Sequence, residues 1–89
     1  MTEYLLELYV ARADAVAVER GAERVRRAAE EHTREGTPVR YLRSIFVPED
    51  ETCYLLFEAA SVEAVREAAQ LAGLPFAHVA AAIETEGKP

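Results

Sequence analysis

The sequence predicts an α+β fold in which two helices cover one face of a four-stranded antiparallel sheet. Two patterns support this prediction: apolar residues alternate with polar ones in short segments, and in two longer segments they recur every three or four residues. The chain has 89 residues and is 51% hydrophobic, with only four Gly and four Pro. A chain of this size buries one core, so we expect a single domain over residues 1–85 and a flexible tail over 86–89.

The first half of the chain predicts a strand, a long helix and a second strand. Residues 3–10 alternate in polarity over the length of a typical strand. An apolar stripe with helical spacing follows over residues 14–35, with Asp14 placed as its N-cap and Gly36 just after its end. Residues 39–47 are rich in β-branched and aromatic side chains, which favours a strand.

The second half predicts a strand, a helix and a last strand. Residues 52–59 have strand composition, and the acidic segment 48–51 that precedes them is typical of a hairpin loop. Ser61 is placed as the N-cap of a second helix, which we expect to end at Gly73. The last strand is expected over 79–85, where three consecutive alanines lower the strand propensity.

This order of elements is that of the ferredoxin-like βαββαβ fold. Its two helices cover one face of the sheet, whereas the strands predicted here have apolar residues on both faces. A second copy of the sheet is a common cover for such a face. We therefore expect a homodimer, in the form of a dimeric α+β barrel.

Alternation along the strands predicts which side chains point away from the helices. Leu6 and Leu8 are assigned to the helix side together with Cys53, Leu55 and Phe57. The uncovered side is then predicted to carry polar and aromatic side chains among Leu5, Ile45 and Leu56, namely Glu7, Tyr9, Tyr41, Arg43, Tyr54 and Glu58. An apolar surface with a few convergent polar groups is typical of a ligand pocket, and these six residues are the candidate ligand-binding site.

This group of residues has two interpretations. In a ligand pocket, Arg43 would anchor a carboxylate or a polarised carbonyl, Glu7 or Glu58 would accept a proton, and tyrosine hydroxyls would orient the ligand. In a structural interface, the same charges would form an ion-pair network that fixes the register of the dimer. The sequence leaves both interpretations open.

Composition and missing motifs exclude several functions. Sixteen Asp and Glu against ten Lys and Arg give a net charge of −6, which disfavours nucleic acid as a partner. Since no apolar run reaches the roughly 20 residues of a membrane span, and the single Cys53 forms no intrachain disulfide, we expect a cytoplasmic protein without a membrane partner. There is no Gly-rich phosphate loop, nucleophile elbow or Cys-x-x-Cys motif, and no cofactor is predicted.

Metal ligands are sparse. His32 lies on the apolar stripe of the first helix, where we expect a partly buried structural histidine. His78 is expected in the loop before the last strand, and its alternative role is in a surface metal site shared across a dimer axis. These two histidines are the candidate metal ligands, while Cys53 is expected to be a small buried hydrophobe.

Residues 39–59 and 61–76 resemble a small bacterial domain-of-unknown-function family that includes a nickel-binding protein. The runs Arg43-Ser44 and Asp50-Glu51-Thr52 are the most specific parts of this resemblance. It implies a ferredoxin-like subunit that pairs into a dimer, and nickel binding in some members of the family. Nickel or another divalent metal is therefore the candidate ion for this chain. It transfers no metal ligand to this chain, because a histidine-rich ligand set is absent.

Two functional hypotheses follow. The first is a structural or ligand-binding homodimer that uses the uncovered face of the sheet, with metal binding as a special case. The second is a cofactor-free isomerase, cyclase or monooxygenase that acts on a small organic substrate in the barrel cavity, by analogy with other dimeric α+β barrels. An enzyme requires an acid or base with a shifted pKa inside a cavity, whereas side chains fill a structural interface.

Overall fold

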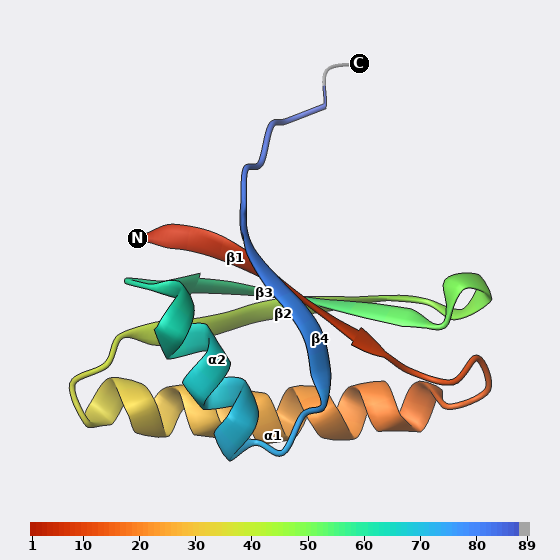
Figure 1. The fold of residues 1–89 in the computed structure, drawn as a ribbon, viewed down its shortest axis with the longest axis horizontal. Coiled ribbons are helices and arrows are strands. Elements are labelled where there is room, and N and C mark those ends of the chain that lie inside the picture. The colour runs from red at the N-terminus through yellow and green to blue at the C-terminus, as the bar shows by residue number, and fades with distance from the viewer. Residues whose placement is uncertain (88–89) are drawn as a thin grey trace.

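The computed structural model describes residues 1–87 and has the predicted order of elements. These are β1 (Thr2–Tyr9), α1 (Ala15–Arg34), β2 (Val39–Val47), the 3₁₀ turn η1 (Pro48–Asp50), β3 (Thr52–Ala59), α2 (Val62–Leu71) and β4 (Phe76–Ala82). Within the described residues the sheet has the order β2-β3-β1-β4, and each neighbouring pair is antiparallel (Figure 1). The predicted ferredoxin-like α+β fold is confirmed.

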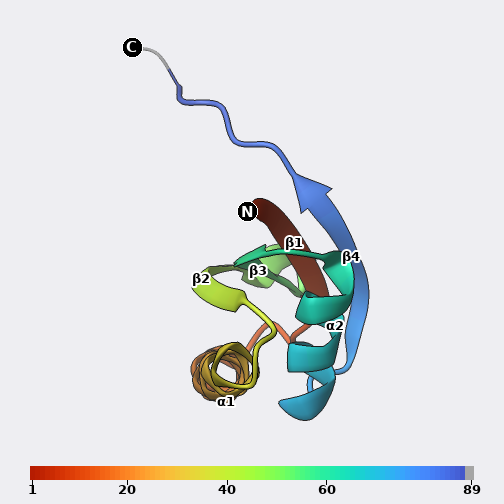
Figure 2. The ribbon, with the colours of Figure 1, turned by 90° about the vertical axis from the view of Figure 1, so that its left-hand side faces the viewer.

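The two helices lie on the same side of the sheet, and the chain beyond β4 leaves on the other side (Figure 2). The core forms between the sheet and the helices, where Leu6, Val25, Phe57 and Val65 are fully buried. Burial of such apolar side chains is the main favourable term in folding. The opposite side of the sheet is covered by no helix of the described chain.

The predicted helix boundaries are confirmed by their caps. The Asp14 carboxylate accepts a hydrogen bond from the Ala17 N–H at 3.2 Å, and the Ser61 hydroxyl accepts one from the Ala64 N–H at 3.2 Å. Gly36, with φ 99°, directly follows the C-cap of α1, in the left-handed region that favours glycine. Neither helix in residues 1–87 combines the length and the apolar character that crossing a membrane requires.

The last strand differs from its predicted position. β4 begins at Phe76 and ends at Ala82, whereas the sequence predicts a strand over 79–85. Pairing with the central strand β1 outweighs the low strand propensity of the alanines, and the ladder extends back to a pair between Leu8 and Phe76. Of the predicted tail at 86–89, residues 88–89 lie outside the described part of the chain, and residues 86–87 belong to no helix or strand.

Candidate functional site

The register of the strands assigns each side chain to one face of the sheet. Residues directly opposite each other on neighbouring strands point to the same face. Leu6 faces the helices together with its partner Leu55, so the next residue, Glu7, faces away. We call the side turned away from the helices the open face; it carries Glu3, Leu5, Glu7, Tyr9, Arg40, Arg43, Ile45, Tyr54, Leu56, Glu58, His78 and Ala80.

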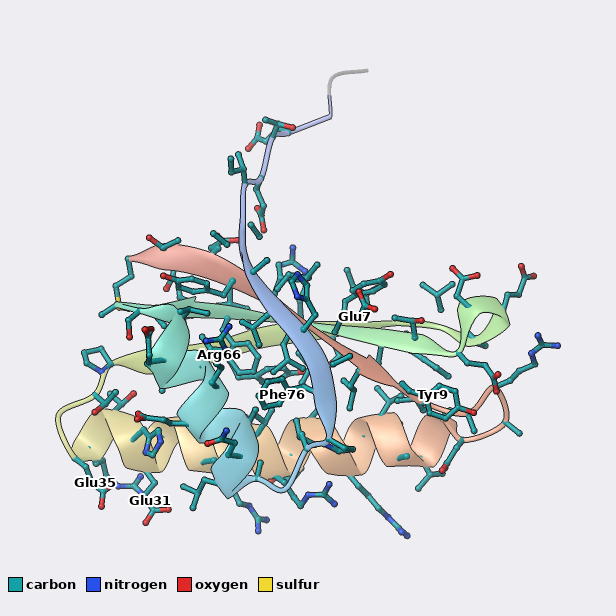
Figure 3. The ribbon with its side chains drawn as sticks, viewed as in Figure 1. Glu7, Tyr9, Glu31, Glu35, Arg66 and Phe76 are labelled. Atoms are coloured by element: carbon teal, nitrogen blue, oxygen red, sulfur yellow. The ribbon has the colours of Figure 1, made fainter. Side chains whose placement is uncertain are left out.

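Five of the six predicted site residues point to this open face: Glu7, Arg43, Tyr54 and Glu58 lie within it, and Tyr9 lies at its margin. Glu7 lies in the middle part of β1, directly opposite Tyr54, whereas Tyr9 lies where the strand ends (Figure 3). Tyr9 is 66% exposed, and its hydroxyl donates to Glu51 Oε2 at 3.4 Å. Tyr9 therefore stands at the margin of the face, next to the loop after β2.

Tyr41 does not lie on the open face, and its predicted placement is wrong. The register of β2 shifts between Tyr41 and Arg43, so that Leu42 is an extra residue in the strand. Such a bulge reverses the alternation on one side of it. Tyr41 is opposite Phe57 and packs edge-on against its ring, with centroids 5.8 Å apart, while its hydroxyl hydrogen-bonds the Ser44 hydroxyl. It belongs to the helix-facing side.

Three carboxylates, of Glu3, Glu58 and Glu84, lie with Arg40 and Arg43 at one end of the open face, and sequence reasoning missed two of the three. Arg40 Nη1 lies 3.8 Å from Glu58 Oε1. Glu3 is directly opposite Glu58, and Arg43 Nη2 lies 3.1 Å from Glu84 Oε1. A hydrogen bond between the carboxyl groups of Glu3 and Glu84, together with partial burial and the charges of Glu84 and Glu58, raises the pKa of Glu3. No local pattern in the sequence indicates this cluster, because Glu84 comes from beyond the last strand.

The two candidate metal ligands lie in different layers. His32 belongs to α1, with Nδ1 3.9 Å from Glu35 Oε1. Glu35 and Glu31 lie at the C-terminal end of α1, away from Glu7 in the sheet (Figure 3). His78 lies within β4 rather than before it, directly opposite Glu7 and next to a second register shift. The structure brings His78 into the open face and leaves His32 in the helix layer.

Residues 1–87 contain no group of three or more His, Cys, Asp or Glu arranged to hold a metal ion. The Glu7 and His78 pair supplies two ligands of suitable chemistry from one chain. Cys53 is not available to this pair, since it is only 1% exposed on the helix side, where burial raises the pKa of its thiol. The predicted role of Cys53 as a buried hydrophobe is confirmed.

Two cavities in the described part of the chain adjoin the sheet, and both lie mainly on its helix side, with Arg40 and Tyr9 as their contributions from the open face. One of about 530 Å³ lies between the C-terminal half of α1 and β2, and includes Tyr41 in its lining. The other, of about 280 Å³, lies beside the N-terminal half of α1 and includes Tyr9. Glu7, Arg43 and Tyr54 line neither cavity. The residues predicted to share one pocket are therefore distributed over three places.

The fold and the open face define a small ferredoxin-like protein with a sheet that is charged and apolar on its uncovered side. The SCO4226-like family, described as nickel responsive proteins, matches residues 9–81. The chain belongs to this family. The resemblance noted over residues 39–76 is thereby confirmed, and it extends through α1.

Comparison with solved structures supports the fold. The chain is similar to a structure reported as the crystal structure of SCO4226 from Streptomyces coelicolor A3(2), with a TM-score of 0.79 and 14% sequence identity. The similarity covers 94% of this chain and 99% of that chain. At this identity the likeness concerns the fold alone. No curated protein matches the sequence.

Proposed function

We propose that this protein responds to nickel as a homodimer, in which two open faces pack together and Glu7 and His78 of both copies bind the ion. The observation that carries the proposal is the direct opposition of Glu7 and His78 on neighbouring strands of the uncovered face. The family match, to proteins described as nickel responsive, supplies the choice of metal.

The ligand chemistry favours this pair. Imidazole nitrogen suits nickel, and a carboxylate oxygen complements the charge of a divalent cation. Directly opposed side chains on antiparallel strands have Cβ atoms about 4.5–5.5 Å apart, which is close enough to share one ion. The register shift beside Glu7 also supports a special role, because bulges often re-aim a side chain at a functional site.

A second copy would complete the ligand set. One chain supplies two ligands, and a two-fold axis close to the pair would double this number to four. The open face has the character of a pairing surface, since Ile45 is 47% exposed there opposite Tyr54, Leu5 lies on the same face, and charged side chains flank these groups. Ile83, just beyond β4, is 93% exposed, so a partner that covered it would bury nearly the whole side chain.

The test is native mass spectrometry of the untagged protein before and after addition of nickel, zinc or copper salts, followed by exchange into a weak chelator. We expect a dimer that retains nickel in a fixed ratio. Glu7→Gln and His78→Ala should each lose the ion, while the matched control His32→Ala should keep it. Retention of nickel by the His78 variant would refute the ligand assignment, and a monomer at micromolar concentration would refute the pairing.

The alternative of a cofactor-free enzyme gains no specific support. Such an enzyme requires its acid and base inside a cavity. The candidate proton acceptors Glu7 and Glu58 lie on the open face and line neither of the two cavities beside the sheet. We therefore put forward the metal-responsive dimer alone.

A further inference from the structure

The cavity of about 280 Å³ on the helix side of the sheet is a separate feature, away from the open face. Leu8, Cys53 and Leu55 form its buried floor, and each is at most 8% exposed. The first half of α1 and the loop from α2 to β4 form its walls. Since this cavity and the open face belong to opposite sides of the sheet, pairing through the open face would leave the cavity accessible.

Small residues of α1 keep this space free. Ala17, Gly21 and Ala22 line it from the helix, in positions where larger apolar side chains would fill it. Gly21 is unusual, because glycine in the interior of a helix lowers its stability. A Cβ at this position would lie 3.3 Å from Leu74 Cδ2, so the glycine allows Leu74 to approach the helix closely. An empty apolar space also destabilises a fold. Binding of an apolar molecule would offset the stability lost through the helical glycine and through the empty space.

The charged groups at the mouth of the cavity already have partners within the protein. The Asp14 carboxylate accepts a hydrogen bond from the Ala17 N–H, and Arg24 Nε donates to the Ala72 carbonyl oxygen at 3.0 Å. Burial holds the Cys53 thiol in its neutral form by raising its pKa. The cavity therefore presents aliphatic surface and no free charge on its floor, which favours an uncharged ligand.

The volume sets the size of this ligand. An apolar cavity of about 150 Å³ holds one benzene ring. The present cavity is larger, at about 280 Å³, and is open to solvent on one side. We propose that it binds an uncharged aromatic molecule of two fused rings, of the size of indole.

The experiment is a titration of the isotope-labelled protein with indole, followed by NMR. We expect saturable shifts of the methyl signals of Leu8, Leu55 and Leu74. Ala22→Leu would place a larger side chain in the cavity and should weaken binding at least tenfold. Ala15→Leu is the matched control, because Ala15 is an exposed residue of the same helix that does not line the cavity.

A second filling variant, Ala17→Leu, guards against a folding defect, and circular dichroism verifies the fold of each variant. Titration without saturation would overturn the proposal, as would saturation whose shifts lie at Leu5 and Ile45 on the open face. Unchanged binding by folded Ala22→Leu and Ala17→Leu would also overturn it. The probe contains no metal, so a negative result here leaves the nickel proposal standing.

Discussion

Arg43 in β2 and Glu84 beyond β4 form an ion pair, with Nη2 3.1 Å from Oε1. β2 and β4 are the two edges of the sheet, so this contact brings the segment after β4 over the open face. Leu56 lies opposite Arg43 and is only 6% exposed, although it is not part of the core between sheet and helices. The geometry thus supports the interpretation in which Arg43 belongs to a charge network.

Replacing Arg43 with alanine tests that network. Both partners of the ion pair are about half exposed, so Arg43→Ala should lower the free energy of unfolding by no more than about 1 kcal/mol. The variant should weaken the proposed dimer much more, because Glu3 and Glu84 would lose the cation beside them, whereas Glu58 would keep Arg40. Urea unfolding and analytical ultracentrifugation measure the two effects.

Arg27→Ala is the matched control for this prediction, since Arg27 forms an exposed ion pair with Glu23 on α1. We expect it to change stability by a similarly small amount and to leave pairing unaffected. If Arg43→Ala and Arg27→Ala had equal effects on pairing, Arg43 would not belong to the interface.

The carboxyl group of Glu3 should make stability depend on pH. Its pKa is raised above the ordinary value of 4.5 by the hydrogen bond with Glu84 and by neighbouring negative charge. The folded state therefore holds this proton more tightly than the unfolded state, and stability falls as pH rises from 4.5 through the raised pKa. Glu3→Gln removes the titrating group, so it should flatten this fall and leave the variant more stable than the parent protein at neutral pH.

Urea unfolding at a series of pH values measures this effect. Glu49→Gln, in the exposed turn η1, serves as the control and should leave the slope unchanged. If stability changed with pH in parallel for the parent protein and for Glu3→Gln, the neighbouring carboxyl groups would not raise the pKa of Glu3.

Tyr41→Phe tests the bulge in β2. The substitution removes the hydroxyl that bonds Ser44 and keeps the ring that packs on Phe57. We expect a loss of about 0.5–1.5 kcal/mol in the free energy of unfolding. Metal binding and pairing should not change, because Tyr41 lies on the helix side.

Tyr54→Phe provides the comparison on the open face, where Tyr54 is directly opposite Glu7. If pairing or nickel retention depended on the hydroxyl of Tyr41 and not on that of Tyr54, the assignment of Tyr41 to the helix side would be contradicted. Native mass spectrometry of both variants measures this.

The elements were predictable because their signals are local. Asp14 and Ser61 cap the helices that follow them, and Gly36 and Gly73 take the left-handed conformation at the helix ends. Which side chains of a strand face the helices was predictable only where successive residues alternate between the two faces without a bulge. Both sets of alternate residues in β2 contain apolar side chains, so the pattern gives no sign of the bulge that moves Tyr41.

The candidate site needed information that no single segment contains. Glu7 meets His78 only because β1 pairs with β4 in one particular register, and this register follows from the whole sheet. Glu3 and Glu84 come from opposite ends of the chain, and their proximity depends on the course of the chain after β4. Sequence reasoning identified Glu7, Arg43 and Glu58 on the strands, and it missed Glu3 in β1 and Glu84 beyond β4.

The exposure of Ile83 provides the last test of pairing. At 93% exposed, this side chain contributes almost nothing to the stability of the single chain, so Ile83→Ser should change the free energy of unfolding of the monomer by less than about 0.5 kcal/mol. If a partner covers it, each copy buries one isoleucine, worth at least about 1.5 kcal/mol. Because the dimer contains two copies, Ile83→Ser should then raise the dissociation constant of the dimer roughly a hundredfold.

Sedimentation at a series of concentrations measures that constant, and Val16→Ser is the matched control. Val16 is 54% exposed and lies on α1, in the layer opposite the open face. An equal effect of the two substitutions would mean that pairing depends on exposed apolar area in general, and no effect of Ile83→Ser would remove the segment after β4 from the interface. A large effect of Ile83→Ser alone would place the partner on the open face, where this segment meets Arg43.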